Sequence, residues 1–289
     1  MRTGPARRQR PRVHPSRNLI PVSSPGRSHP LAQQPRQNAY AVILAAGVGR
    51  RLGTAADDRP KVLLEFGGRT LLERHLEALR ACGVEEVSIT VGHRRELIEA
   101  EVARLGQSDR VRFVHNPRYR EGSLVSLWTQ AARLRAADGG GPLLLMDGDV
   151  LYDRRLIARL LAAPGENVLL VDRDIEPGEE PVKVCFRGDR IVDFAKRPVH
   201  AHDWHGESVG FFRFSPAMAA ALADRCAAYV EEGRTALEYE EAIRDLILAA
   251  PDRFSATEVT DLPWIEIDFE ADVARARSEI LPLLERDAA

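Results

Sequence analysis

Residues Tyr40–Lys61 read Tyr-Ala-Val-Ile-Leu-Ala-Ala-Gly-Val-Gly-Arg-Arg-Leu-Gly-Thr-Ala-Ala-Asp-Asp-Arg-Pro-Lys, and this stretch decides the fold. Its first seven residues are apolar enough to form a strand buried on both faces, and they stop at glycines. A glycine loop after such a strand lets backbone N–H groups approach phosphate oxygens, because no Cβ stands in the way. The stretch therefore predicts a strand, a phosphate-binding loop and a helix.

Two common glycine motifs do not fit this loop. A dinucleotide fingerprint needs glycine where Leu52 stands, and a P-loop needs Gly-Lys-Ser/Thr, whereas Lys61 follows Pro60. The pattern Leu-Ala-Ala-Gly-x-Gly-x-Arg-Leu followed by Pro-Lys resembles the signature of nucleotidyltransferases that join a nucleoside triphosphate to a phosphorylated sugar or alcohol. The resemblance implies that Arg51 and Lys61 neutralise the triphosphate, in agreement with two cations beside a glycine loop. It also implies nucleotide contacts from Leu44, Ala45, Ala46, Gly47 and Gly49.

The charge of the chain is unevenly distributed. Residues 1–38 contain eight arginines, seven prolines and no acidic residue, whereas the whole chain of 289 residues has a net charge of −2. The remainder is thus acidic, which argues against binding of nucleic acid. We expect residues 1–38 to be a disordered extension, with a transit peptide or a basic arm as alternatives. No segment is apolar enough for stable membrane insertion, and three widely spaced cysteines indicate a reduced, cytoplasmic compartment.

Strands and helices alternate from Tyr40 onward. This alternation predicts an α/β fold, a Rossmann-like mixed and mostly parallel sheet flanked by helices, with a small β-hairpin and helical part that binds the second substrate. We expect one domain, 39–289, with a nucleotide-binding half, 39–172, and an acceptor-binding half, 173–289. Expected helices include 70–81, 95–105, 155–162 and 216–231, and expected strands include 86–92, 111–115, 142–146, 167–172 and 207–214.

A second informative stretch runs from Asn116 to Trp128. Gly122 and Ser123 open a helix there, and such a start is either an ordinary serine cap or a place where free N–H groups receive a base edge. The stretch resembles the base-recognition segment of bacterial phosphocholine cytidylyltransferases. That resemblance implies that Gly122 and Ser123 contact a pyrimidine.

Carboxylates follow the buried strand that ends at Met146. Asp147-Gly148-Asp149 places two of them at its carboxyl end, where they are costly to bury without a cation, and Mg²⁺ is the usual cation in phosphate chemistry. In the family Asp149 corresponds to the Mg²⁺ ligand, and Asp147 lies near the ribose or a water. Near the end of the chain, the predicted strand 263–268 places Trp264, Glu266 and Asp268 on one face. The resemblance implies a second metal-binding element, with Asp268 as ligand and Glu266 beside it.

A predicted hairpin, strands 182–186 and 190–194 around Arg187-Gly188-Asp189, carries the remaining cations. Lys183 lies within it and Lys196 just after it, and the family has a lysine at about both places, in contact with a phosphate. A metal site is conceivable at the closely spaced His200, His202 and His205, but we expect an exposed histidine loop instead.

Together these features predict Mg²⁺-dependent transfer of a cytidylyl group from CTP to a phosphorylated alcohol, and the resemblance favours phosphocholine. Inositol 1-phosphate, 2-aminoethylphosphonate and a sugar 1-phosphate are alternative acceptors. An Asp-x-Asp glycosyltransferase is a different class, which leaves the glycine loop unexplained, and a non-catalytic nucleotide sensor is a third. Aromatic and acidic side chains would hold the choline group. The candidates are Tyr152, Glu207, Tyr239, Glu240 and Trp264.

Overall fold

The fold is described from a computed structural model, which covers residues 38–49, 51–52, 59–136, 141–175 and 180–286. All of them belong to one compact unit, Gln37–Ala289. The predicted extension, apart from Asn38, lies outside the described residues, and so does most of the glycine-rich connection 138–141. Within the described part of the chain no helix combines the length and hydropathy needed to cross a membrane.

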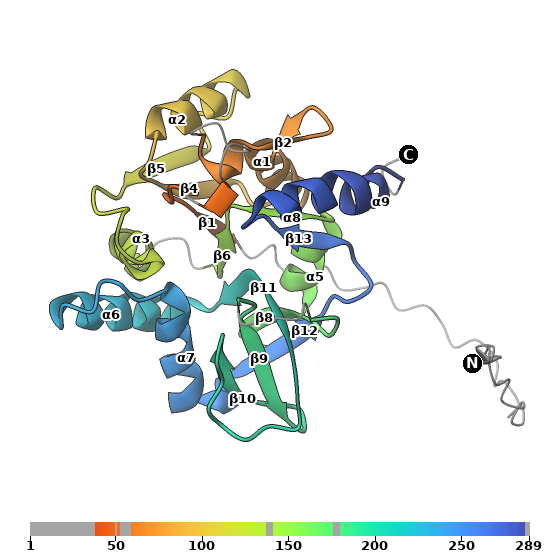
Figure 1. The fold of residues 1–289 in the computed structure, drawn as a ribbon. Coiled ribbons are helices and arrows are strands. Elements are labelled where there is room, and N and C mark those ends of the chain that lie inside the picture. Colours follow the sequence, from red (N-terminus) through yellow and green to blue (C-terminus); the bar gives the residue numbers. More distant parts are fainter. Residues whose placement is uncertain (1–37, 50, 53–58, 137–140, 176–179, 287–289) are drawn as a thin grey trace, which may run out of the picture. The chain divides into compact units, whose positions relative to one another are not determined.

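Among the described residues, nine strands form the main sheet, with a path β10-β9-β11-β6-β1-β4-β5 and with β8 and β12 joined beside β11 (Figure 1). The strands β1, β4, β5 and β6 run parallel, whereas β11 is antiparallel to β6, β8 and β9. The predicted halves therefore share one sheet. The strands of this sheet are β1 (Tyr40–Ala45), β4 (Glu86–Val91), β5 (Val111–His115), β6 (Leu143–Asp147), β8 (Asn167–Asp172), β9 (Lys183–Arg187), β10 (Arg190–Ala195), β11 (Trp204–Phe214) and β12 (Phe254–Glu258).

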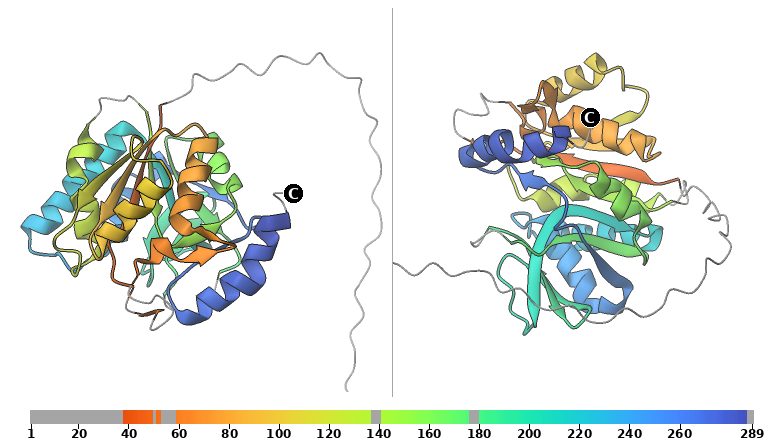
Figure 2. Two further views of the ribbon diagram at one scale, coloured as in Figure 1. Left: turned by 90° about the horizontal axis from the view of Figure 1, so that it is seen from above. Right: turned by 90° about the vertical axis from the view of Figure 1, so that its right-hand side faces the viewer.

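Helices cover both faces of the sheet (Figures 1 and 2). Side chains alternate along β1, so Ala41 and Ile43 pack in one core with α1, α2 and α5, and Tyr40 and Val42 pack in the other with α3, α4, α6 and α7. The helices are α1 (Leu71–Ala81), α2 (Arg95–Arg104), α3 (Ser123–Trp128), α4 (Ala131–Arg135), α5 (Arg155–Ala162), α6 (Pro216–Glu231) and α7 (Tyr239–Ala249).

A third, smaller core lies where the end of the chain returns to the sheet. Strand β13 (Trp264–Glu266) pairs antiparallel with β7 (Val150–Tyr152), and Ile265 packs with Leu52 and Leu151. This pairing brings the second acidic motif next to the first. The remaining elements are β2 (Glu65–Phe66), β3 (Arg69–Thr70), α8 (Glu270–Arg275), α9 (Leu281–Arg286), the 3-10 turns η2 (Lys61–Leu63) and η4 (Pro251–Arg253), and the π-helical turn η5 (Ala276–Ile280).

The structure confirms the α/β fold and most predicted elements. Helix ends follow local signals: the Thr70 side chain accepts the Glu73 N–H at 3.0 Å at the start of α1, and Ser215 caps α6 in the same way, just before Pro216. The predicted strand 263–268 is shorter, Trp264–Glu266, because only these residues find a partner in β7. Strand β11 begins at Trp204, so the predicted histidine loop ends inside a strand.

Candidate active site

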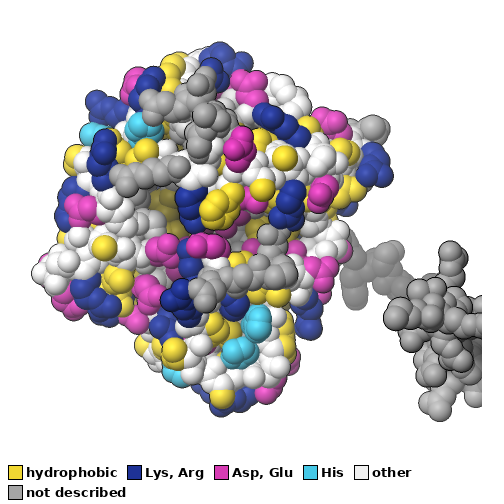
Figure 3. Space-filling view, viewed as in Figure 1, with side chains coloured by type: hydrophobic (Ala, Val, Ile, Leu, Met, Phe, Trp, Pro, Cys, Tyr) yellow, Lys and Arg dark blue, Asp and Glu magenta, His cyan; other side chains and the backbone are white. Residues whose placement is uncertain are grey.

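A cleft of about 620 Å³ lies at the carboxyl ends of β1 and β6, and an adjoining space of about 400 Å³ borders the glycine loop. Figure 3 shows acidic and basic side chains gathered around this central hollow. Parallel strands bring their carboxyl ends to one edge, so the glycine loop after β1 and the acidic turn after β6 meet there. The predicted site residues that line the two spaces are Leu44, Ala45, Gly47, Gly49, Arg51, Lys61, Ser123, Asp147, Asp149, Lys196, Glu207, Tyr239, Glu240, Trp264, Glu266 and Asp268.

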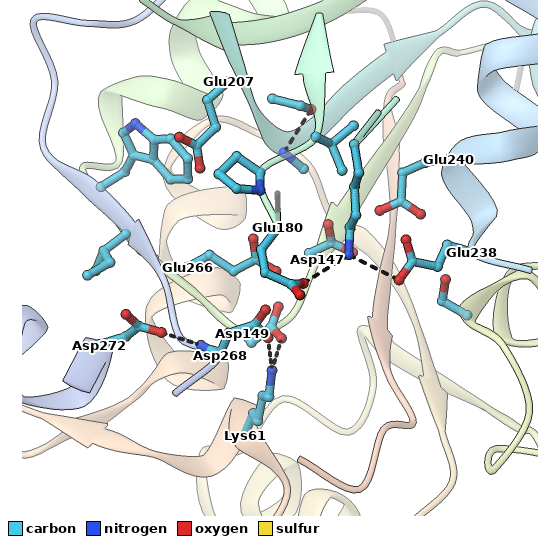
Figure 4. Close-up of a pocket in the computed structure, with 18 of the residues that line it drawn as sticks. Lys61, Asp147, Asp149, Glu180, Glu207, Glu238, Glu240, Glu266, Asp268 and Asp272 are labelled. Atoms are coloured by element: carbon cyan, nitrogen blue, oxygen red, sulfur yellow. Dashed lines mark hydrogen bonds and ion pairs between the residues drawn. The ribbon is translucent and has the colours of Figure 1, made fainter. Parts of the chain in front are cut away.

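Three carboxylates from two distant segments converge in the cleft. Oxygen atoms of Asp149, Glu266 and Asp268 all lie within 4.8 Å of one another. Lys61 reaches two of them, with its Nζ 2.9 Å from Asp149 Oδ2 and 2.6 Å from Asp268 Oδ1 (Figure 4). The pairing of β13 with β7 fixes this geometry, since Glu266 lies opposite Val150.

Burial and mutual repulsion perturb the charges of this group. Burial, followed by the charges of Asp149 and Asp268, raises the pKa of Glu266 well above its usual range. Burial opposes the charged form of Lys61, but its ion pairs with Asp149 and Asp268 outweigh burial and raise its pKa. Three carboxyl groups thus crowd around Lys61, with Arg51 also in contact with Asp268, and a divalent cation would stabilise their charged forms.

Asp147 has a different environment from Asp149. Its Oδ2 accepts a hydrogen bond from the Tyr239 hydroxyl at 2.7 Å, and burial and the charge of Glu240 raise its pKa. Gly210 in β11 makes room for it, because a Cβ at that glycine would lie 2.3 Å from Asp147 Oδ2, and the φ of Gly210 is +77°. Gly148 is needed for a similar reason, since its Cβ would lie 2.8 Å from the backbone oxygen of Leu44.

The other cations of the cleft are already paired with carboxylates. Arg51 contacts Glu180 at 3.0 Å and Asp268 at 2.9 Å. Lys196 contacts Glu238 at 3.1 Å and Glu180 at 3.4 Å. Burial disfavours the charge on each cation, but these partners prevail and raise both pKa values.

Acidic and aromatic side chains line two further parts of the cleft. The indole Nε1 of Trp264 donates to Asp172 Oδ2 at 2.7 Å, and Glu207 is buried nearby on β11. Glu240, at the start of α7, lies on the side of Glu238 and Lys196 (Figure 4), and its Oε2 atom is buried and has no hydrogen-bond partner. Burial and the charge of Glu238 raise the pKa of Glu240 to about 8.

Four predicted site residues lie elsewhere. The structure corrects the prediction for Tyr152: its ring packs on Phe211, its hydroxyl lies 3.2 Å from His75 Nδ1, and it does not line the cleft. Lys183 does not line the cleft, and its Nζ donates to the backbone oxygens of Pro181 and Lys196. Gly122 and Ala46 also lie outside the lining.

Local packing explains these positions. Tyr152 follows the buried strand register of β7, which turns its side chain into the core. Gly122 allows a close approach of two chain segments, because a Cβ there would lie 1.9 Å from the backbone oxygen of Leu237. The neighbouring Ser123 does reach the cleft, and its Oγ accepts the Tyr239 N–H at 3.0 Å.

Sequence reasoning missed several lining residues. Asp172 stands at the carboxyl end of a correctly predicted strand, and that position could have pointed to it. Glu180 and Gly210 had no such signal, because Glu180 contacts Arg51 and Gly210 approaches Asp147, both more than sixty positions away. The further lining residues that were not predicted include Asp174, Ser208, Asp272 and Arg275.

The histidines do not form a metal cluster in the described part of the chain, where only Asp149, Glu266 and Asp268 meet the geometry. His200 Nδ1 lies 2.9 Å from the buried Asp193, and His202 Nε2 lies 3.2 Å from His205 Nδ1. His75, on α1, is fully buried.

The fold, together with a family match and curated relatives, defines a nucleotidyltransferase. The chain matches the MobA-like NTP transferase domain over residues 41–241 and belongs to that family. Its fold resembles CTP:phosphocholine cytidylyltransferase from Streptococcus pneumoniae, with a TM-score of 0.66 and 19% identity over 83% of this chain and 98% of that one. It also resembles the inositol-1-phosphate CTP transferase from T. maritima, with a TM-score of 0.68 and 21% identity over 88% and 97%.

Curated relatives include three proteins with different acceptors in their names. The chain is 28% identical to CMP-5'-(3-aminopropyl)phosphonate synthase of Streptomyces rubellomurinus, over 84% of this chain and 39% of that protein. It is 30% identical to the bifunctional IPC transferase and DIPP synthase of Rubrobacter xylanophilus, over 85% and 53%. It is 22% identical to CTP:phosphoglutamine cytidylyltransferase of Campylobacter jejuni, over 81% and 97%. The chain thus spans about half or less of the length of the first two relatives.

Proposed function

We propose that this chain transfers a cytidylyl group from CTP to the phosphate or phosphonate of a small molecule with a positive charge, with phosphocholine as the first acceptor to test. The observation that carries the proposal is one cleft in which a glycine loop and Lys61 meet three converging carboxylates. Relatives and structural neighbours named for CMP or CTP support the choice of nucleotide.

The reaction needs no activated side-chain nucleophile. The second pKa of a phosphomonoester is about 6, so at neutral pH the acceptor already has an anionic oxygen that can attack the α-phosphorus of CTP. A new P–O bond forms, the bond to the β-phosphate breaks, and its electron pair leaves with pyrophosphate. Arg51, Lys61 and Lys196 surround the cleft and would align the anionic groups and neutralise the charge that develops on pyrophosphate.

Asp149, Asp268 and Glu266 would hold Mg²⁺. Their donor set fits, because all three ligands are carboxylate oxygens within 4.8 Å of one another and Glu266 has a strongly raised pKa. The ion would supply charge neutralisation at the phosphates. Lys61, which contacts two of these carboxylates, would then be free to contact phosphate oxygens instead.

The acidic lining of the cleft favours a cationic acceptor over inositol 1-phosphate or a sugar 1-phosphate. Glu207 and Asp172 lie there together with the aromatic side chain of Trp264. The unpartnered Oε2 of Glu240 also favours a second candidate, a primary aminoalkylphosphonate, because its N–H groups can donate a hydrogen bond to that oxygen. A trimethylated ammonium has no such donor.

The test is pyrophosphate release with Mg²⁺ from CTP, UTP, ATP and dTTP, each combined with phosphocholine, 2-aminoethylphosphonate, inositol 1-phosphate and glucose 1-phosphate. We expect turnover with CTP and a cationic acceptor, and a loss of at least roughly 100-fold in Asp149→Ala. Asp109→Ala is the matched control, because Asp109 is exposed and far from the cleft.

Each outcome has a definite meaning. Turnover with phosphocholine alone would identify aromatic recognition of the ammonium group, and a preference for the aminophosphonate would identify hydrogen bonding to Glu240. Turnover only with a neutral acceptor would refute a cationic substrate. Without pyrophosphate release in any pair, the cytidylyltransferase proposal is wrong and the glycosyltransferase interpretation returns.

A further inference from the structure

A second cavity, lined by Tyr152 of β7, contains more arginines than carboxylates in its lining. It has a volume of about 420 Å³ and lies between α1, β7, the start of α5 and α9. Four of its lining residues are arginines, Arg69, Arg74, Arg154 and Arg155, against two carboxylates, Glu77 and Asp153. We call it the arginine cavity. It shares no lining residue with the cleft described above.

The carboxylates of the arginine cavity neutralise only two of the four guanidinium groups. Arg69 contacts Glu77 at 2.7 Å, and Arg155 contacts Asp153 through two nitrogens, at 2.9 and 2.6 Å. Arg154 is exposed and makes no hydrogen bond or ion pair with any residue that the structure describes. Its charge therefore remains available to a ligand.

Arg74 is the deepest of the four and is incompletely paired. Its NH2 group donates to the backbone oxygen of Phe66 at 2.6 Å, but its Nε is buried and has no hydrogen-bond partner. Burial and the neighbouring charge of Arg69 lower its pKa, although Glu285, Glu77 and Glu73 partly offset them. A buried donor without an acceptor costs free energy, and an anion in the cavity would supply the acceptor.

We propose that the arginine cavity binds a compact anion that carries a phosphate group. The cavity places Arg154, which has no carboxylate partner among the described residues, beside three other guanidinium groups, and guanidinium binds tetrahedral oxyanions through two parallel hydrogen bonds.

Tyr152 and His75 connect the arginine cavity to the acidic turn of the cleft. Tyr152 lines the cavity, and its hydroxyl lies 3.2 Å from Nδ1 of the buried His75. The other ring nitrogen of His75 lies 3.1 Å from the backbone oxygen of Gly148, between the two aspartates of the acidic turn. An anion bound in the cavity would thus contact the strand that positions Asp149.

The experiment is a calorimetric titration of the full chain with inorganic phosphate, without nucleotide. We expect binding that Arg154→Gln weakens roughly tenfold or more, because it removes a charge-assisted contact. Arg112→Gln is the matched control, since Arg112 is an exposed arginine of β5 that lines neither the cleft nor the arginine cavity. Lys61→Met tests for phosphate bound in the cleft instead.

Binding that survives in Arg112→Gln and Lys61→Met but weakens in Arg154→Gln supports the proposal. Binding that Lys61→Met abolishes and Arg154→Gln leaves unchanged places the phosphate in the cleft and overturns it. Absence of phosphate binding by the unmodified chain also overturns it. Because the readout is binding, these outcomes do not depend on cytidylyl transfer.

Discussion

Replacing Lys61 with methionine tests whether the three carboxylates of the cleft form a cation site. The change keeps an apolar chain of similar length but removes the charge that lies 2.9 Å from Asp149 and 2.6 Å from Asp268. Removing one partner of a buried ion pair costs about 3–5 kcal/mol. Here the side chains of Lys61, Asp149 and Asp268 are 16%, 23% and 17% exposed, and Arg51 still contacts Asp268, so we expect a smaller loss.

We expect the free energy of unfolding to fall by about 2 kcal/mol in Lys61→Met, which corresponds to a decrease in Tm of roughly 4–8 °C for a domain of this size. Mg²⁺ at millimolar concentration should restore most of this loss, because it binds the folded carboxylates and not the unfolded chain. The assay is thermal and urea unfolding, with Mg²⁺ and with a chelator.

Lys196→Met is the matched control. The side chains of Lys196, Glu238 and Glu180 are 31%, 50% and 57% exposed, and exposed pairs contribute about 1 kcal/mol or less. Mg²⁺ should have no special effect on this variant. An unchanged stability of Lys61→Met, or a loss that Mg²⁺ does not reduce, would refute the cation site.

Two further variants test the support of the acidic turn and of the core beside it. Gly210→Ala should lose more stability than Gly233→Ala and, unlike it, should also lose activity. Both glycines have a positive φ, +77° and +73°, which costs an alanine about 1–2 kcal/mol. Only at Gly210 would the new Cβ also meet Asp147. Equal losses of stability in urea unfolding would contradict this contact. His75 has a pKa lowered by burial to about 4, against 6.5 when unfolded, so its contribution to stability is present above pH 6.5 and is lost as the pH falls toward 4. Between pH 7 and pH 4, the free energy of unfolding should fall by up to about 3 kcal/mol more in the unmodified chain than in His75→Gln. The same pH dependence of the free energy of unfolding in both proteins would exclude a neutral buried His75.

The fold was predictable because its main signals are local. Buried strands such as Leu143–Asp147 are short apolar runs, and helices such as Leu71–Ala81 have periodic leucines between a threonine cap and Gly83. The acidic turn and the glycine loop each follow such a strand directly. Parallel pairing then brings them together, so this half of the cleft follows from the order of elements.

The acceptor end was less predictable because it depends on register and on contacts between distant segments. A strand of three residues, β7, decides whether Tyr152 enters the cleft or the core, and sequence alone does not fix the partner strand that sets its register. Lys183 illustrates the same limit: it lies on the predicted hairpin, but its amine reaches backbone oxygens instead of the cleft. Glu180 and Gly210 are recognisable only from side chains that pack against them.

The scarcity of lysine is a further signal in the sequence. The chain has 41 basic residues, and only Lys61, Lys183 and Lys196 are lysines. Arginine serves on the rest of the surface, so a preference for lysine at these positions requires a local reason. A compact ammonium group can exchange between carboxylate and phosphate partners more readily than a planar guanidinium, which holds two oxygens in fixed geometry.

Substrate binding must drive this exchange of the lysines from carboxylate to phosphate partners. Lys61 and Lys196 already contact four carboxylates in the cleft, so neither can bind a phosphate without leaving at least one of them. A triphosphate brings about four negative charges and would compete for both lysines, and the released carboxylates would then need a new cation. A divalent ion between Asp149 and Asp268, and a cationic acceptor beside Glu238 and Glu240, would satisfy them. On this proposal, the acidity of the cleft would favour binding of nucleotide, metal and acceptor together.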